Sequence, residues 1–230
     1  MKLWLVDLLT YPWQARSAWL VPDEIKRACR FRFEDDRRRY RAAHCALREV
    51  LGQWFDSDPG SFEFRENQYG KPSVNITADS LLAGCHFNLS HSADLALIGI
   101  SADVEIGIDI EIVSDVNNLW PLAEQNFTPV ERDELRAAPP DERSHTFLRG
   151  WTRKEACLKA VGCGLSIAPK SFHTGLSNNP AEVIVETEDG MVQLRVENLD
   201  VGLGQVATAA WIVLRHELNH TSTRTNLSSI

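Results

Sequence analysis

The chain has 230 residues, of which 43% are hydrophobic and 24% charged, an ordinary globular composition with room for one large domain or two small ones. Its formal net charge of −8 argues against a nucleic-acid-binding protein, because a phosphate backbone attracts a positive surface. No apolar run approaches the ~20 residues that span a bilayer, and Asp7 comes too early for a secretory signal. We therefore expect a cytoplasmic protein with no membrane or nucleic-acid partner.

The five cysteines are scattered along the chain and form no C-x-x-C pair. A disulfide framework or a structural zinc site would need paired, regularly spaced cysteines. We therefore expect reduced thiols, which suit the cytoplasm.

The first half of the chain is predicted to hold one long basic helix and several strands. Within that helix, Leu47, Val50, Leu51 and Trp54 follow the i, i+3, i+4, i+7 spacing of one buried face. The predicted elements are, in order, a strand over 2–9, the helix over 22–54, and strands over 62–64, 86–90 and 95–100.

The second half begins with a strand over 105–113, which alternates cleanly between apolar and other residues. A helix is predicted to begin at Thr128, where a capping box is followed by proline at the first helical position. Another helix is predicted over 144–160, then strands near 184–185, 192–196 and 206–214, and a polar end. Each half thus supplies a helix followed by strands, although no repeat is visible in the residues themselves.

Asp109 and Glu111 are the first candidate site residues. They lie two apart on the predicted strand, so both carboxylates leave the same face. Neighbouring carboxylates repel one another unless a cation lies between them, and oxygen ligands suit Mg²⁺ or Mn²⁺. A solvated strand face is the alternative.

The helix over 144–160 adds a third carboxylate. Trp151, Glu155 and Lys159 share one face at i, i+4 and i+8. Glu155 would complete a set of metal-binding carboxylates, and Lys159 would meet anionic oxygens one turn further on. The alternative is a surface Glu–Lys pair, which contributes only about 0.3–0.5 kcal/mol.

Two further motifs indicate an anionic ligand. Ser90 and His91 are predicted at a strand end, where a hydroxyl, an imidazole and free backbone amides would bind an anion. A Ser/His nucleophilic pair is the alternative, although sequence neighbours rarely have the geometry of a triad. In the loop Gly70-Lys71-Pro72 the glycine permits close approach of a ligand and the lysine supplies charge, unless it is only a turn.

Together these motifs resemble the 4′-phosphopantetheinyl transferase family in its larger single-chain form. That family shows a G-K-P loop, an N-(I/L)-S-H-S strand end, a G-(I/V)-D-(I/V)-E strand and a W-x-x-K-E-x-x-x-K helix in the same order. The matching segments of this chain are 70–72, 88–92, 107–111 and 151–159.

The resemblance implies transfer of the phosphopantetheine arm of coenzyme A to a serine of an apo carrier protein, with release of 3′,5′-ADP. It implies that Asp109, Glu111 and Glu155 bind Mg²⁺, or Mn²⁺ in its place, and that Asp109, Glu155 and Lys159 are catalytic. Lys159 would stabilise the pyrophosphate. Glu155 would be a metal ligand, a general base or both, and the sequence leaves this choice open.

The resemblance also implies a coenzyme site. His91 and Arg27 would bind the 3′-phosphate, and Lys71 and Gly70 would lie near the adenine. The carrier would dock on the segment 113–127, which includes Trp120 and Leu122. The complete set implied to contact coenzyme A is Arg27, Gly70, Lys71, Pro72, Asn88, Leu89, Ser90, His91 and Lys159.

The implied fold is α+β, with two similar subdomains packed as a pseudo-dimer and the active site in the cleft between them. Residues 1–105 would form the subdomain on the nucleotide side. Residues 106–214 would form the subdomain with the metal carboxylates, on the carrier side, and 215–230 a polar tail. A chain that contains both halves is expected to act as a monomer.

Two other functions stay open at this stage. One is a metal-dependent nuclease, which also uses strand carboxylates with a nearby lysine. The other is a non-catalytic module that binds coenzyme A or a carrier protein. The resemblance also leaves open whether the carrier belongs to fatty-acid, polyketide or nonribosomal-peptide synthesis.

Overall fold

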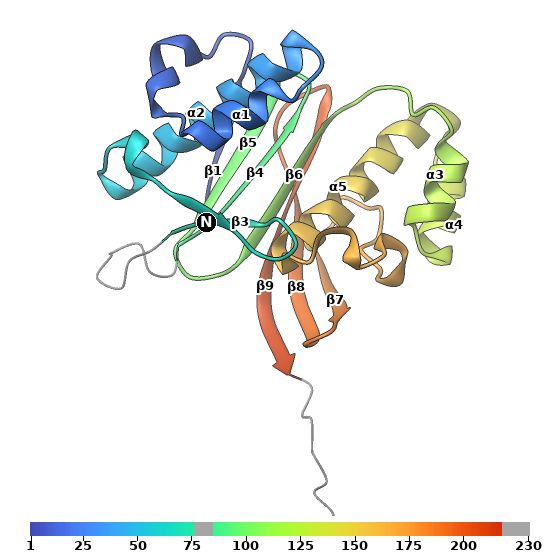
Figure 1. Cartoon of the computed structure of the whole chain (residues 1–230). Helices are drawn as coiled ribbons and strands as arrows, with labels where there is room; N and C mark the ends of the chain where they lie inside the picture. The colour runs from blue at the N-terminus through green and yellow to red at the C-terminus, as the bar shows by residue number, and fades with distance from the viewer. Residues whose placement is uncertain (76–84, 218–230) are drawn as a thin grey trace, which may run out of the picture.

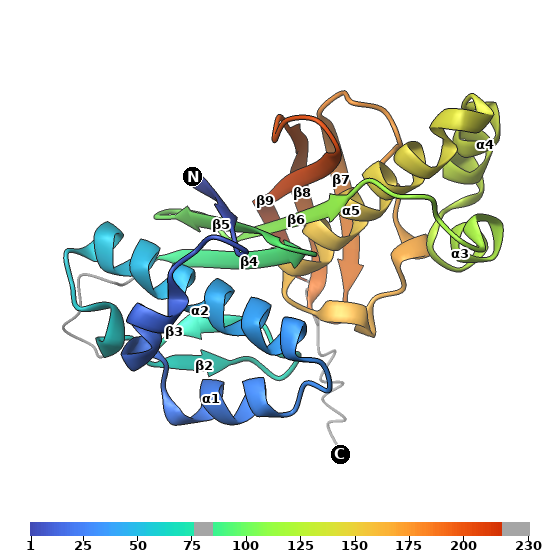
Figure 2. The same cartoon turned by 90° about the horizontal axis from the view of Figure 1, so that it is seen from above.

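The computed structural model describes residues 1–75 and 85–217, which form two α+β halves packed side by side as a pseudo-dimer (Figure 1). The predicted fold class is therefore confirmed. In each half a long helix lies across an antiparallel sheet, with α2 on the first sheet and α5 on the second (Figure 2).

The first half contains a three-stranded sheet in the order β1-β5-β4 and a separate hairpin of β2 and β3. Apolar residues of α2, such as Leu47 and Leu51, pack against Phe87 and Ile98 of the larger sheet. The elements are β1 (Lys2–Asp7), α1 (Pro22–Cys29), α2 (Glu34–Phe55), β2 (Phe64–Glu66), β3 (Pro72–Val74), β4 (His86–Ser92) and β5 (Leu95–Ser101).

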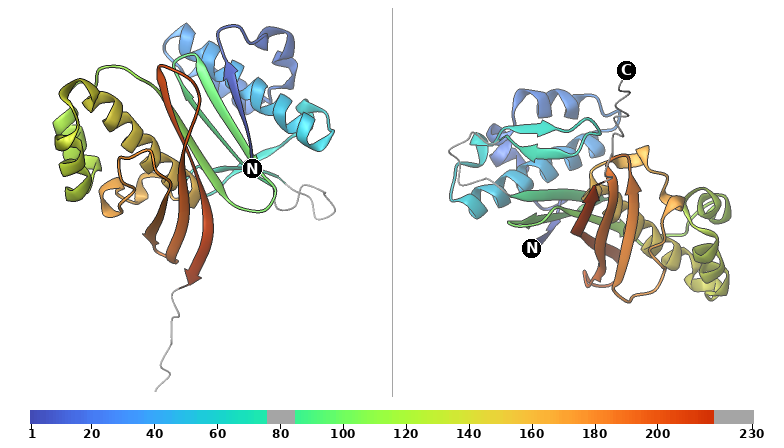
Figure 3. Two further views of the ribbon diagram at one scale, coloured as in Figure 1. Left: turned by 180° about the vertical axis from the view of Figure 1, so that it is seen from behind. Right: turned by 90° about the horizontal axis from the view of Figure 1, so that it is seen from below.

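The second half contains a four-stranded sheet in the order β6-β9-β8-β7. Ala156 and Ala160 of α5 pack against Val185, Leu194 and Ala210 of that sheet. The smaller helices α3 and α4 lie near the N-terminal end of α5 (Figure 3). The elements are β6 (Ile106–Ile112), α3 (Leu119–Asn126), α4 (Pro129–Ala137), α5 (Arg143–Val161), β7 (Ala181–Thr187), β8 (Gly190–Leu199) and β9 (Gln205–Glu217).

The basic stretch over 22–54 is two helices, so the prediction of one helix is wrong. Glu24 of α1 accepts a hydrogen bond from Arg48 of α2 at 3.0 Å, and both side chains are buried. In one straight helix these residues would be about 36 Å apart. The buried charge pair therefore requires the chain to fold back between Cys29 and Glu34.

Smaller differences follow from pairing over long range. The strand predicted over 62–64 begins instead at Phe64, since Phe62 is buried and packs beside Phe55. Its partner β3 and the helix α3 were not predicted. The last strand continues past Leu214 to Glu217, because it pairs with β8 along that length. The capping box at Thr128 is confirmed, with its hydroxyl accepting from the backbone amide of Glu131 at 3.2 Å.

The two halves meet where β4 lies beside β6, and side chains join these strands. Asn88 accepts a hydrogen bond from the backbone amide of Ile108 at 3.0 Å. Two residues on, Ser90 donates to the Asp109 carboxylate at 2.7 Å. Ser92 in turn donates to Glu111 at 2.6 Å and accepts from the amide of Ile112. Alternate residues of β4 thus point toward β6, as strand geometry requires.

Of the helices in the described ranges 1–75 and 85–217, none has both the length and the apolar character that a membrane-spanning segment requires.

Gly107 of β6 sets how closely α5 approaches the sheet. An added Cβ there would overlap the backbone of Ala156 and Ala160. We expect Gly107→Ala to lower the free energy of unfolding by about 1–3 kcal/mol or more, because the helix must move away. Urea denaturation measures this effect.

Gly99→Ala is the matched control on the neighbouring strand β5, where an added Cβ would lie 3.2 Å from the flexible side-chain ends of Ile106 and Leu3. A smaller loss is expected at Gly99. Equal losses at the two positions would contradict the assigned role of Gly107.

Candidate active site

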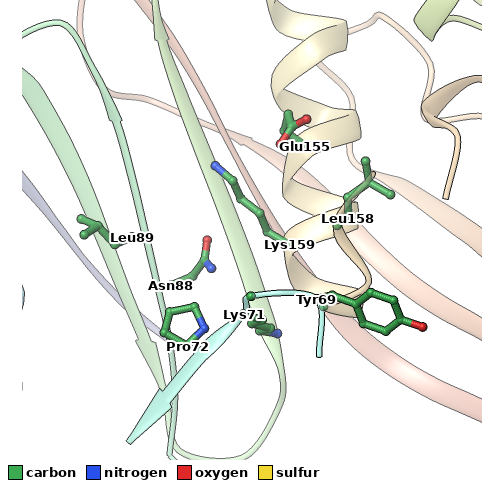
Figure 4. A pocket seen from close by; sticks show the side chains of 11 residues that line it. Tyr69, Lys71, Pro72, Asn88, Leu89, Glu155, Leu158 and Lys159 are labelled. Atoms are coloured by element: carbon green, nitrogen blue, oxygen red, sulfur yellow. The ribbon is translucent and has the colours of Figure 1, made fainter. Parts of the chain in front are cut away.

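The candidate site is a pair of adjoining cavities, of which the smaller lies at the junction of the two halves. The smaller, of about 220 Å³, lies between the loop before β3, the middle of β4 and the last turns of α5 (Figure 4). The larger, of about 580 Å³, extends from there toward α1 and α2. Both are lined by Gly70, Pro72, Asn88 and Leu89.

A carboxylate and an ammonium group pair across the junction of the halves. Asp109 is buried, with only 4% of the residue exposed. Its Oδ1 accepts hydrogen bonds from Lys159 Nζ at 2.6 Å and from Ser90 Oγ at 2.7 Å. Lys159 Nζ also lies 3.0 Å from Ser90 Oγ. Three elements therefore meet at one carboxylate oxygen, which is the arrangement that the sequence motifs predict only in part.

Two more carboxylates lie near this pair. Desolvation raises the pKa of Glu111, and the Asp109 charge raises it further, against the hydrogen bond from Ser92 and the charge of Lys159. Desolvation likewise raises the pKa of Glu155, and Asp109 and Glu111 raise it further against the pull of Lys159. The three carboxylates thus repel one another, and the folded protein holds them near one another nonetheless.

These donors fit a hard divalent cation. Asp109 Oδ2 is buried, and none of the residues that the structure describes offers it a hydrogen-bond partner. A cation beside Oδ2 would satisfy that oxygen and offset the repulsion from Glu111 and Glu155. Within 1–75 and 85–217, no cluster of three or more His, Cys, Asp or Glu side chains is already arranged as a metal site.

Three of the alternative interpretations are wrong. Asp109 does not lie on a solvated strand face, because it is buried. Lys159 forms its ion pair with Asp109 rather than with Glu155 one turn away. Ser90 and His91 do not form a nucleophilic pair, since Ser90 points to Asp109 while His91 lines the larger cavity.

The predicted anion-binding turn at Ser90 is also wrong. The motif does lie at the end of β4, which runs to Ser92, but its residues are still paired with Leu97, Ala96 and Leu95 of β5. Its backbone is therefore part of a sheet and cannot form a nest of free amides.

The larger cavity brings together the two residues predicted to bind a phosphate. Arg27 on α1 and His91 on β4 both line it. The guanidinium of Arg27 is exposed and donates to Glu66 at 3.0 Å. Desolvation lowers the pKa of His91, and the positive charge of Lys159 lowers it further, which is the effect expected where cationic groups converge.

The sequence analysis missed three residues of this cavity. His44 Nδ1 lies 2.9 Å from the carboxylate of Glu24, and its ring stacks on Tyr40 with centroids 4.0 Å apart. The i, i+4 spacing of Tyr40 and His44 on a helix is a signal for their stacking. No local pattern connects either residue to Glu24 on another helix.

Lys71 and Lys154 are placed differently from one another and from Lys159. Lys71 lines the smaller cavity, but its Nζ donates to the carbonyl of Ala160 at 2.8 Å, and desolvation lowers its pKa. Lys154 faces away from the cavities and forms a fully buried pair with Glu131 at 2.8 Å. Of the two lysines in the helix motif, only Lys159 therefore reaches the carboxylates.

Comparisons with known proteins give a consistent result. Residues 105–210 match the model of the 4′-phosphopantetheinyl transferase superfamily, and residues 9–103 match that of the 4′-phosphopantetheinyl transferase N-terminal region. The 4′-phosphopantetheinyl transferase HetI of Nostoc sp. strain PCC 7120 is 40% identical over 86% of this chain and 83% of its own length. The 4′-phosphopantetheinyl transferase Sfp of Bacillus subtilis is 27% identical over 81% of this chain and 80% of its own.

The crowding of carboxylates makes a prediction about stability. We expect Glu155→Gln to raise the Tm of the protein in EDTA at pH about 7.5. A carboxyl group whose pKa is raised by folding destabilises the folded state as the pH climbs from its unfolded toward its folded pKa. The gain should therefore vanish near pH 4, and each 1 kcal/mol corresponds to about 2–4 °C.

Differential scanning fluorimetry at the two pH values measures this gain. Glu124→Gln on α3, where the side chain is exposed, is the control and should leave the Tm unchanged. A gain that persists at pH 4, or that the control reproduces, would show that charge repulsion at Glu155 is not its cause.

Proposed function

The chain belongs to the 4′-phosphopantetheinyl transferase superfamily and transfers phosphopantetheine to carrier proteins, and we propose that this reaction requires Mg²⁺ and releases 3′,5′-ADP from coenzyme A. The observation that carries the proposal is the contact of Lys159, which lines the smaller cavity, with Ser90 and Asp109 where the two halves meet. A cationic group beside buried carboxylates suits the transfer of a phosphoryl group that is already crowded by negative oxygens.

Residues at and beside the smaller cavity divide the chemistry among them. Asp109, Glu111 and Glu155 would hold the Mg²⁺ ion, which when bound would offset the negative charge of the pyrophosphate. Lys159 would donate a hydrogen bond to a phosphate oxygen, because its side chain lies between the two halves and is partly exposed.

Glu155 is the candidate general base. In the transfer step, the carrier serine oxygen forms a bond to the phosphorus of the phosphopantetheine arm. The bond from that phosphorus to the bridging oxygen breaks, and 3′,5′-ADP leaves with the electron pair. The serine proton passes to Glu155, whose raised pKa makes it a better proton acceptor than an ordinary glutamate.

We assign the nucleotide end of coenzyme A to the larger cavity. Arg27 and His91 line it and are suited to the 3′-phosphate, and His44 offers a further imidazole that Glu24 orients. Gly70, Pro72, Asn88 and Leu89 line both cavities, so a ligand that spans the two would pass over them. An elongated molecule with phosphates near its middle matches this arrangement.

A direct test is mass spectrometry of an apo carrier protein incubated with this protein, coenzyme A and Mg²⁺. We expect a mass gain of one phosphopantetheine arm, together with 3′,5′-ADP in the solution. Asp109→Ala should reduce the rate at least about 100-fold, because it removes the partner of Lys159 and a metal ligand. EDTA should have a comparable effect.

Asp103→Ala, which changes an exposed carboxylate before β6, is the matched control and should keep full activity. Activity of Asp109→Ala at ordinary Mg²⁺ would remove Asp109 from the ligand set. Binding of coenzyme A without a mass gain on any carrier would favour a non-catalytic module, and cleavage of DNA in a parallel assay would favour a nuclease.

The carrier is proposed to dock on the segment 113–127. Trp120 of α3 is 37% exposed, and the guanidinium groups of Arg136 and Arg143 lie 5.9 and 5.6 Å from its ring centroid. An aromatic ring flanked by two cations suits an acidic partner with an apolar contact. Leu122 packs in the cluster around Phe127, so its truncation would also affect folding.

We therefore expect Trp120→Ala to raise the KM for the carrier protein by about tenfold, the loss of one moderate hot spot. The KM for coenzyme A should stay unchanged. Steady-state kinetics with each substrate varied in turn measures both. Ile184→Ala, which truncates an exposed residue of β7, is the control. Equal effects of Trp120→Ala on both KM values would contradict the docking assignment.

We also propose that the protein acts as a monomer in the cytoplasm. Both halves of the site come from one chain, and all five cysteines are free thiols, which suits a reducing compartment. Size-exclusion chromatography with light scattering tests the monomer.

A further inference from the structure

Asn67 organises the loop that lines both cavities. Its Oδ1 accepts hydrogen bonds from the backbone amides of Tyr69 and Lys71, each at 2.9 Å. Its backbone amide donates to the carbonyl of Lys71, and its carbonyl accepts from Gly70. Gly70 has a φ of 86°, which a glycine tolerates. The tight turn between β2 and β3 is therefore built around this one side chain.

The same side chain reaches the other half of the protein. Its Nδ2 donates to the carbonyl of Gly162 at 2.9 Å, 95 residues along the chain. Gly162 is the C-cap of α5, in the left-handed conformation with φ 81°. The last carbonyls of a helix have no partner within the helix, so Asn67 supplies one from outside. Lys71 supplies another by donating to Ala160.

The end of α5 held in this way carries the reactive groups. Lys159 directly precedes Ala160 in the last turn of α5. Glu155 lies one turn earlier on the same face, as Figure 4 shows. On its other side the helix rests on Gly107 of β6. A shift of the last turn would therefore move the Lys159 ammonium relative to Asp109.

We propose that Asn67 is a positioning residue that couples the loop at the coenzyme cavity to the end of α5 that carries Lys159 and Glu155. This rests on the proposed function. Its Oδ1 shapes the loop and its Nδ2 fixes the helix end, so the two tasks belong to different atoms of one amide. The site geometry then depends on a contact made by a residue that touches neither the carboxylates nor the ammonium group.

The division between the two atoms allows a sharp test. Asn67→Asp keeps an acceptor for the amides of Tyr69 and Lys71 but cannot donate to Gly162. Asn67→Ser keeps a shorter acceptor and likewise cannot reach Gly162, so it serves if the aspartate variant folds poorly. Asn67→Ala loses both contacts. Ser73→Ala, on the same hairpin, is the matched control, because the Ser73 hydroxyl donates to the carbonyl of Arg65 within the hairpin.

We expect Asn67→Asp and Asn67→Ser to lower kcat about tenfold through misplacement of the reactive groups, with the KM for coenzyme A within about threefold of the original. Asn67→Ala should lower kcat and raise this KM as well. Ser73→Ala should change neither. An Asn67→Asp variant with unchanged kcat, or with kcat and KM altered as in Asn67→Ala, would overturn the proposal.

Hydrogen exchange supplies a readout that does not depend on the reaction. In Asn67→Asp, peptides covering 158–162 should exchange faster, while those covering 64–74 should keep their protection. Unchanged exchange at 158–162 would overturn the coupling whatever the kinetics. Absence of transfer by the original protein would instead count against the proposed function, and the exchange result would stand apart from it.

Discussion

The two halves of this protein are joined by polar side chains of β4 that replace a ladder of backbone hydrogen bonds. Asn88, Ser90 and Ser92 alternate along the strand and reach the amides and carboxylates of β6. This junction fixes the register of Asp109 against Ser90, and the geometry of the candidate site depends on that register. The residues that hold the two halves together are thus the residues that shape the candidate site.

A second constraint is the close approach of α5 to β6 at Gly107, where only a hydrogen atom separates the glycine backbone from the helix. This close approach allows the Lys159 ammonium to form a hydrogen bond with the buried carboxylate of Asp109. The close approach also keeps Glu155 near Asp109 and Glu111 in spite of their mutual repulsion. The folded protein thus loses some stability at this place, in return for a concentration of negative charge of the kind that a divalent cation would offset.

Much of this arrangement could be predicted from local patterns. Strand alternation placed Asp109 and Glu111 on one face, and helical spacing brought Glu155 and Lys159 together. The same patterns failed where contacts over long range decide the outcome. The break between α1 and α2 depends on the pairing of Glu24 with Arg48, and the pairing of Ser90 and His91 with β5 replaces the turn of free amides that was expected there. Periodicity tells which face a residue is on, but it does not identify the neighbour that this face meets.

The end of α5 has a consequence for how the chain folds. Its last carbonyls accept hydrogen bonds from Asn67 and Lys71. Its Lys159 donates to a carboxylate on β6 and a hydroxyl on β4. Neither half alone would contain all of these partners. Despite the resemblance of the halves in shape, the molecule is therefore expected to unfold in one cooperative transition rather than as two independent units. A gene cut between β5 and β6 would yield two pieces that need each other to fold.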